Sequence, residues 1–284
     1  MLLGLFPACR ADSAPAGIIV SKDIQYHKLP GESPRLLSLD IYSPRDATSL
    51  PVVMMVHGGG WRNGDKSNPG IGTVKPEYFC NAGFVYVTVN YRLSPAVEHP
   101  AHIEDVAAAL RWLHDNVAEY GGDPDRISIM GHSAGAHLVA LLGTDEARLQ
   151  AEGLELLDIE SVICLDGAGY DIPARMAGWP GRLMSNMLNN AFGNDGSKWQ
   201  DASPTLHVHE GVDYPPFLIL HTPRVDAPGQ SMALGDALRA SGSYACNEEA
   251  ADKTHRTINH DIGSTGDWVT ALIMDFLADG KVSD

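Results

Sequence analysis

The sequence predicts an α/β fold in which a mostly parallel central sheet is covered by helices on both faces. Apolar strand-like runs alternate with helix-like segments along most of the 284 residues. The later runs are short and continuously apolar, as expected of strands buried on both faces of a parallel sheet. One of them leads through a Gly-x-Ser-x-Gly pentapeptide into a helical segment. This alternation indicates an open sheet with its active groups in loops at the carboxyl ends of strands.

Six segments have the pattern of strands and four have the pattern of helices. The predicted strands are Leu37 to Tyr42, Val52 to Val56, Val85 to Val89, Ile127 to Met130, Val162 to Leu165 and Phe217 to Leu220. The predicted helices are Ala101 to Val117, Ala136 to Leu142, Gln230 to Ala240 and Asp267 to Ala278. In the first of these helices apolar residues recur every three or four positions, which places them on one face.

Residues 18–284 are expected to form a single domain. A segment rich in Gly, Met, Asn and Trp at about 170–215 is predicted to be a small cap-like insertion. Residues 1–17 are set aside as a tail that resembles the end of an export signal. That tail has no basic region, and its apolar stretch is shorter than the roughly 7 to 15 residues that such a signal needs. The sequence therefore leaves both a cytoplasmic and an exported protein open.

Composition and charge exclude several classes of partner. The formal net charge of -16 and the lack of a dense Lys/Arg cluster disfavour binding to nucleic acid or to an anionic membrane. No apolar stretch approaches the roughly 18 residues of a membrane span. The four cysteines, Cys9, Cys80, Cys164 and Cys246, are far apart and show no CxxC pairing. We therefore expect no metal site and no cofactor. A homodimer stays open as a possible assembly.

Ser133 is the leading candidate for a catalytic nucleophile. It stands in Gly-His-Ser-Ala-Gly at residues 131–135, after the predicted strand Ile127 to Met130 and before a helical run. Glycines on both sides of the serine let the chain turn sharply enough to hold the hydroxyl above the edge of the sheet. The alternative is a serine in an ordinary strand-to-helix turn, which the apolar flanks disfavour.

A second motif, His-Gly-Gly-Gly-Trp at residues 57–61, directly follows the predicted strand Val52 to Val56. Consecutive glycines let the backbone approach a ligand closely and direct amide groups at it, as a developing oxyanion requires. We expect the amides of Gly59, Gly60 and Ala134 to form an oxyanion hole. Trp61, His132 and Trp179 are expected to line the substrate pocket.

The motifs together resemble the α/β-hydrolase superfamily, in the group of hormone-sensitive-lipase-like carboxylesterases, feruloyl and acetylxylan esterase-like enzymes and kynurenine formamidases. The likeness rests on HGGGW at 57–61, GDK at 64–66, VNYRLSP at 89–95, HPAHIEDVAAALRWL at 99–113, GGDPDRI at 121–127 and GHSAGAHLV at 131–139. It covers most of the chain from about residue 20 and is strongest over 50–145. Ala136 stands where lipase-like relatives often carry glycine, which favours the feruloyl and acetylxylan esterase branch.

The resemblance implies a Ser, acid, His order along the chain, with the histidine near the carboxyl terminus. His255, about a dozen residues before the last helix, is the expected base, and His260 is its rival. Asp226 is the expected acid because it follows the strand Phe217 to Leu220 and precedes a helix.

Two other aspartates stay open as the acid, Asp166 and Asp213. They stay open because Thr222-Pro223-Arg224 replaces the usual glycine-acid spacing of the family at this loop. Asp166 ends the strand before, and Asp213 precedes a Pro-Pro turn.

These residues predict a serine esterase that needs no cofactor. It would hydrolyse carboxylic esters of small acyl or aromatic acids, including acetyl or feruloyl esters of carbohydrates, through an acyl-enzyme. An arylformamidase using the same triad is the second hypothesis. The third is a non-catalytic binding protein on a hydrolase scaffold, which would be favoured if Ser133, His255 and a carboxylate lay out of mutual reach.

Overall fold

The computed structural model describes residues 17–167, 169–178 and 180–283. Eight strands in this part of the chain form one sheet: β1 (Ile18–Gln25), β2 (Ser38–Pro44), β3 (Leu50–Val56), β4 (Val85–Val89), β5 (Gly122–His132), β6 (Ser161–Leu165), β7 (Phe217–His221) and β8 (Ala245–Glu249). Their order across the sheet is β1-β2-β4-β3-β5-β6-β7-β8. Strand β2 pairs antiparallel with β1 and β4, and β3 to β8 run parallel to one another.

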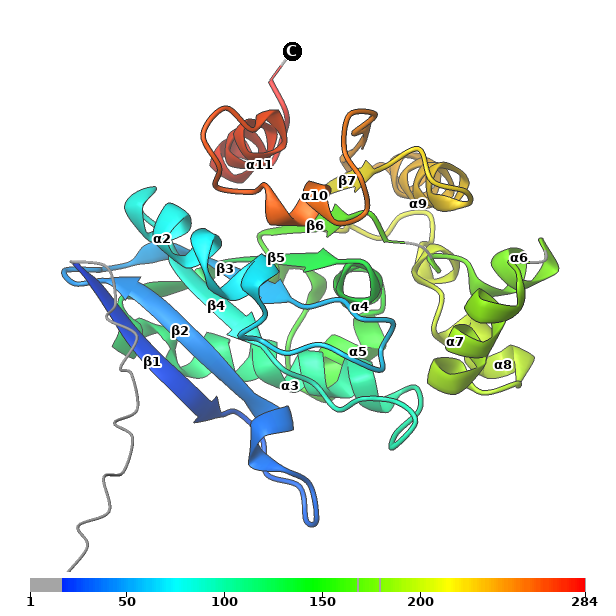
Figure 1. Ribbon diagram of the computed structural model, residues 1–284, viewed down its shortest axis with the longest axis horizontal. Coiled ribbons are helices and arrows are strands. Elements are labelled where there is room, and N and C mark those ends of the chain that lie inside the picture. Colours follow the sequence, from blue (N-terminus) through cyan, green and yellow to red (C-terminus); the bar gives the residue numbers. More distant parts are fainter. Residues whose placement is uncertain (1–16, 168, 179, 284) are drawn as a thin grey trace, which may run out of the picture.

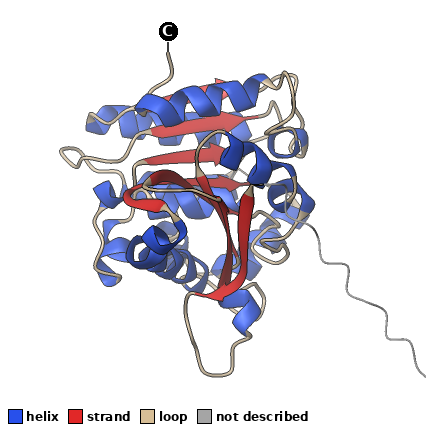
Figure 2. Cartoon of the chain, turned by 90° about the vertical axis from the view of Figure 1, so that its left-hand side faces the viewer, coloured by secondary structure: helices blue, strands red, loops and turns tan. Residues whose placement is uncertain are grey.

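Helices cover both faces of this sheet, as Figure 2 shows. The helices of the described residues are α1 (Pro69–Gly72), α2 (Val74–Asn81), α3 (Ala101–Asn116), α4 (Ala134–Leu142), α5 (Glu146–Ala151), α6 (Ile172–Ala177), α7 (Arg182–Phe192), α8 (Gly196–Asp201), α9 (Ala227–Ser241), α10 (Thr257–His260) and α11 (Trp268–Asp279). Four short 3-10 segments are η1 (Pro34–Leu37), η2 (Val117–Tyr120), η3 (Leu156–Asp158) and η4 (Pro204–His207). The predicted α/β fold class is confirmed.

Successive residues of the central strands point to opposite faces, so the sheet separates two hydrophobic cores. In β3, Met54 joins the core made with α3, α4 and α9, whereas Val53 and Met55 join the core made with α2 and α11. Residues 52–56 are all 0% exposed. This double burial explains why the central strands read as unbroken apolar runs rather than as alternating patterns.

All six predicted strands are present, with β4 matching its predicted bounds and β5 extending further toward the amino terminus. The four predicted helices correspond to α3, α4, α9 and α11. The two edge strands, β1 and β8, were not predicted. Edge strands bury one face only and carry polar residues, and β8 reads Ala-Cys-Asn-Glu-Glu. Its strand structure follows from pairing with β7 rather than from an apolar pattern.

Helices α6, α7 and α8 lie between β6 and β7 in the chain, within the predicted insertion, and gather at the right of Figure 1. Asp171 and Asp195 begin α6 and α8 by accepting hydrogen bonds from backbone amides of the first turn. Apart from Gly17, the tail predicted at residues 1–17 lies outside the described residues. No described helix is both long and apolar enough to span a bilayer.

Candidate active site

Ser133 occupies a sharp turn between β5 and α4. Its backbone has φ 57° and ψ −116°, a conformation that residues other than glycine rarely adopt. A Cβ on Gly131 would lie 2.2 Å from the Gly135 carbonyl oxygen, and one on Gly135 would lie 2.1 Å from the Val56 oxygen. Both glycines are therefore sterically required, and the tight turn predicted from the pentapeptide is present.

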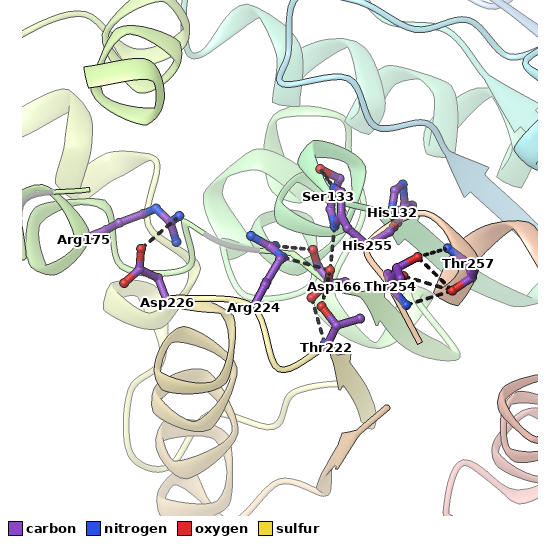
Figure 3. A network of polar contacts seen from close by, with 10 residues as sticks. All are labelled: His132, Ser133, Asp166, Arg175, Thr222, Arg224, Asp226, Thr254, His255 and Thr257. Atoms are coloured by element: carbon purple, nitrogen blue, oxygen red, sulfur yellow. Dashed lines mark hydrogen bonds and ion pairs between the residues drawn. The ribbon is translucent and has the colours of Figure 1, made fainter. Parts of the chain in front are cut away.

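The hydroxyl of Ser133 lies within hydrogen-bond reach of an imidazole. His255 Nε2 is 3.0 Å from Ser133 Oγ, and His255 Nδ1 is 2.6 Å from Asp166 Oδ2 (Figure 3). When Nδ1 carries the proton, it donates a hydrogen bond to the carboxylate, and Nε2 is free to accept a hydrogen bond from the hydroxyl. The three side chains come from loops after β5, after β6 and after β8, which all reach the carboxyl edge of the parallel strands.

Asp166 is fully buried and is held by four donors from three residues. Its Oδ1 accepts from the Thr222 amide at 3.0 Å, and its Oδ2 accepts from Thr222 Oγ1 at 3.0 Å, Arg224 Nε at 2.8 Å and His255 Nδ1 at 2.6 Å. Burial by itself would raise the pKa of this carboxyl. The hydrogen bonds and the charge of Arg224 outweigh burial and lower the pKa to about 2, so the group is ionised near neutral pH.

The structure corrects the prediction that Asp226 orients the base. Asp226 begins α9 with a side chain that is 41% exposed, and its nearest cation is Arg175, with Asp226 Oδ2 3.6 Å from Arg175 Nη2. From the loop after β7, Thr222 and Arg224 contact the triad through Asp166, whereas Asp226 lies away from it (Figure 3).

The register of the sheet explains this error. Strands β6 and β7 are parallel neighbours with Leu165 opposite Leu220, so Asp166 leaves the sheet beside the start of the loop after β7. Either strand can thus supply the acid, and Asp166 was among the open alternatives. Asp213, the other alternative, precedes β7 and therefore belongs to the opposite edge of the sheet.

The histidines near the triad have distinct positions. His132 Nε2 lies 2.7 Å from the carbonyl oxygen of His255 and can donate to it, which ties the loop of the base to the turn of Ser133. Burial lowers the pKa of His132 to about 3, and the adjacent His255 acts in the same direction, so this ring is neutral near pH 7. His260, the rival base, lies in α10 and packs against Gly70 instead of Ser133.

The glycine loop after β3 brings backbone donors beside Ser133. Gly59 and Gly60 have φ values of 118° and 62°, which only glycine adopts readily. Within the described residues, the amides of Gly59, Gly60 and Ala134 donate to no acceptor. All three residues line the same cavity as the Ser133 hydroxyl. Unpaired amides around a cavity can stabilise a negative oxygen, which is what the predicted oxyanion hole requires.

The cavity at the triad has a volume of about 380 Å³. It is lined by Gly59, Gly60, Trp61, His132, Ser133, Ala134, Met184, Met187, Arg224 and His255. Two of the predicted pocket residues, Trp61 and His132, thus lie in its wall, although Trp61 is only 1% exposed and donates from Nε1 to His137 Nδ1 at 3.3 Å. The third, Trp179, lies outside the described residues. Sequence reasoning missed Arg224, which carries no motif of its own.

One cluster elsewhere in the described chain has the spacing of metal ligands, namely Asp145, Asp201 and His207. Arg148 forms ion pairs with both of its carboxylates. The guanidinium already neutralises the acids, so this cluster has the character of an ion-pair network linking α5 to α8.

The strand order and the Ser-His-Asp geometry at the carboxyl edge define the class: the fold is that of an α/β-hydrolase with an assembled catalytic-type triad. The comparison with protein families agrees with this class. Residues 39–237 match the model of the BD-FAE family, and the chain belongs to that family.

Individual relatives carry esterase names. Esterase LipQ of Mycobacterium tuberculosis H37Rv is 31% identical over an alignment of 276 residues that covers 90% of this chain and 62% of LipQ. The probable carboxylic ester hydrolase LipM of the same organism is 34% identical over an alignment of 213 residues that covers 70% of this chain and 46% of LipM. The chain thus spans about half to three fifths of the length of these relatives.

Among solved structures, esterase B of Lactobacillus rhamnosis superposes with a TM-score of 0.73 at 22% identity, covering 94% of this chain and 87% of that chain. At this identity the likeness shows the fold. It confirms the α/β-hydrolase fold predicted from the motifs.

Proposed function

We propose that this protein is a serine esterase that hydrolyses carboxylic esters of small acyl or aromatic acids. The observation that carries the proposal is the unbroken chain of contacts from Ser133 Oγ through His255 to the buried carboxylate of Asp166. The esterase names of LipQ and LipM support the same chemistry. The mutual reach of the three side chains disfavours a non-catalytic scaffold.

The geometry supports acyl transfer in two steps. His255 Nε2 takes the proton of Ser133 as Oγ attacks the ester carbonyl, and Asp166 stabilises the imidazolium that forms. The amides of Gly59, Gly60 and Ala134 receive the charge on the carbonyl oxygen. His255 then returns the proton to the departing alcohol, leaving an acyl-enzyme. Water, deprotonated by the same imidazole, releases the acid and restores the serine.

The size and lining of the cavity favour a short or aromatic acyl group. A volume of about 380 Å³ lies toward the small end of ligand pockets, and the thioethers of Met184 and Met187 form part of its wall. Both methionines belong to α7, so we propose that the insertion at about 170–215 acts as a cap on the pocket. Acetyl or feruloyl esters of carbohydrates are the finer substrate assignment that the family likeness suggests.

A panel of substrates tests the proposal. The purified protein is assayed with p-nitrophenyl acetate, acetylated xylan, methyl ferulate and N-formylkynurenine at equal enzyme concentration. We expect the highest kcat/KM with the small activated ester and measurable release of acetate or ferulate. Turnover of N-formylkynurenine alone would instead indicate an arylformamidase. Inertness toward all four, together with no labelling by an organophosphate, would refute the proposal.

The identity of the acid gives a separate prediction. We expect Asp166→Asn to lower kcat for p-nitrophenyl acetate by about 10⁴-fold, because an amide at this position no longer holds Nδ1–H and allows the wrong tautomer. Asp226→Asn, the matched control, is expected to change kcat by less than about 3-fold. Steady-state kinetics of both variants measure the difference in kcat. A large loss of kcat only in the Asp226 variant would reverse the assignment of Asp166 as the acid.

A further inference from the structure

Arg224 connects the triad acid to the substrate cavity. Its Nε donates to Asp166 Oδ2 at 2.8 Å and its Nη2 donates to the Asp166 backbone oxygen at 2.7 Å. The same side chain lines the cavity that contains Ser133 and His255, and it is 27% exposed. Nη1 has no hydrogen-bond acceptor in the part of the chain that the structure describes. The guanidinium therefore presents free donors and positive charge to whatever enters the cavity.

A second arginine, Arg175 of α6, approaches from the insertion. Its side chain is only 3% exposed, and the described residues provide no hydrogen-bond partner for its Nε or Nη1. Its one described ion pair is the contact of 3.6 Å with Asp226, which is longer than a hydrogen bond. Burial lowers the pKa of Arg175; the charge of Asp226 opposes this effect and that of Arg224 adds to it.

Arg224 and Arg175 are two neighbouring cations in a chain of net charge -16. In Figure 3, Arg224 lies between the triad and the Arg175–Asp226 pair, with the two guanidinium groups turned toward one another. Buried donors without acceptors are costly, and two like charges facing one another add to the cost. An anionic group in the cavity beside Arg224 would accept the free N–H group of this side chain and offset the positive charge of both arginines, although Arg175 itself does not line the cavity.

We propose that Arg224, assisted by Arg175, is a recognition site for a carboxylate on the substrate, so that the protein prefers esters carrying a carboxylate over neutral esters of the same shape. The inference rests on the proposed esterase function, because it concerns the selectivity of the same cavity. A carboxylate oxygen accepts from Nη1 of Arg224, while Nε and Nη2 keep their bonds to Asp166. Arg224 is thus a specificity-determining residue as well as a positioning residue for the acid.

Matched ester pairs test the site. One pair is the mono-p-nitrophenyl ester of adipic acid and its adipic monoamide counterpart, which places the charge on the acyl side. The other is 4-acetoxybenzoate and 4-acetoxybenzamide, which places it on the leaving group. For each pair the measured quantity is the ratio of kcat/KM for the anionic ester to that for the neutral ester. We expect this ratio to exceed 1 in at least one pair.

In the pair that shows the preference, Arg224→Met should lower the ratio by about 10-fold or more, and Arg224→Lys should lower it less because the charge remains. Damage to the triad affects both esters of a pair and cancels in the ratio. Arg175→Met should lower the ratio by about 3- to 10-fold. Asp226→Asn should raise it by about 2- to 5-fold, because a competing carboxylate is removed.

Arg182→Met is the matched control, since it removes an exposed cation from α7 without touching the cavity. It should leave the ratio unchanged. If Arg175→Met does not fold, inhibition of the wild-type protein by adipic monoamide and by neutral adipamide gives a second measurement, with the anionic compound expected to bind more tightly. Ratios near 1, or ratios that Arg224→Met does not alter, would overturn the site. Serine-dependent hydrolysis of the neutral esters would in that case still support the proposed function.

Discussion

Replacing Ser133 by alanine is expected to lower kcat for p-nitrophenyl acetate by about 10⁶-fold, to a residual rate set by substrate binding and the oxyanion donors. No other described hydroxyl contacts His255, so the acyl-enzyme cannot form. Alanine also adopts the φ of 57° with strain, as serine does, and it removes a single oxygen from the cavity wall. The fold should therefore persist.

The loss is measured by steady-state kinetics together with mass spectrometry after exposure to an organophosphate, which should label the wild-type protein once and the variant not at all. Circular dichroism and thermal unfolding show whether the variant is folded. Ser264→Ala changes an exposed serine for which no side-chain hydrogen bond is described, and it serves as the control. Near-native turnover by the Ser133 variant would exclude the acyl-enzyme mechanism.

The exchange of His255 for alanine is expected to lower kcat by a similar factor of about 10⁶, because the base that takes the serine proton is then missing. His260→Ala is expected to change kcat by less than about 10-fold, since that ring contacts the Gly70 region rather than Ser133. Both variants carry the same chemical change within a few residues of one another. Steady-state kinetics of both variants with p-nitrophenyl acetate distinguish the two histidines. If the His260 variant alone were inactive, the assignment of His255 as the base would be wrong.

The low pKa of Asp166 gives a prediction for the pH dependence of stability. The pKa of Asp166 is about 2, below the value of about 3.9 for an aspartate in an unfolded chain, so this carboxylate contributes stability above pH 4 that is lost as the pH falls toward 2. Loss of activity between pH 5 and 7 therefore does not come from protonation of Asp166.

The site was predictable where its signals are local. The glycines around Ser133 and in the loop at 58–60 are required by contacts within or next to their own turns, and such requirements can be recognised in a short stretch of sequence. The order of residues along the chain also placed His255 before the last helix. Central strands were recognisable because burial on both faces demands apolar residues at every position.

The acid was not predictable in the same way, because the choice between Asp166 and Asp226 is a question about neighbouring strands. A loop residue after β6 and one after β7 are equally compatible with a carboxylate near the base until the register of the two strands is known. Arg224 illustrates the same limit. Its contact with Asp166 spans 58 residues of sequence, and nothing in the local pattern indicates it.

By itself the sequence determined the layered α/β architecture, the nucleophile turn and the glycine loop, since steric and hydrophobic requirements of single elements leave few alternatives. The tertiary structure alone decided which aspartate faces His255 and that an arginine joins the acid to the cavity. It also placed two methionines of the insertion in the wall of the cavity that contains Ser133. These features depend on how side chains distant in sequence meet at one sheet edge, and only the packed register of β5, β6, β7 and β8 brings them there.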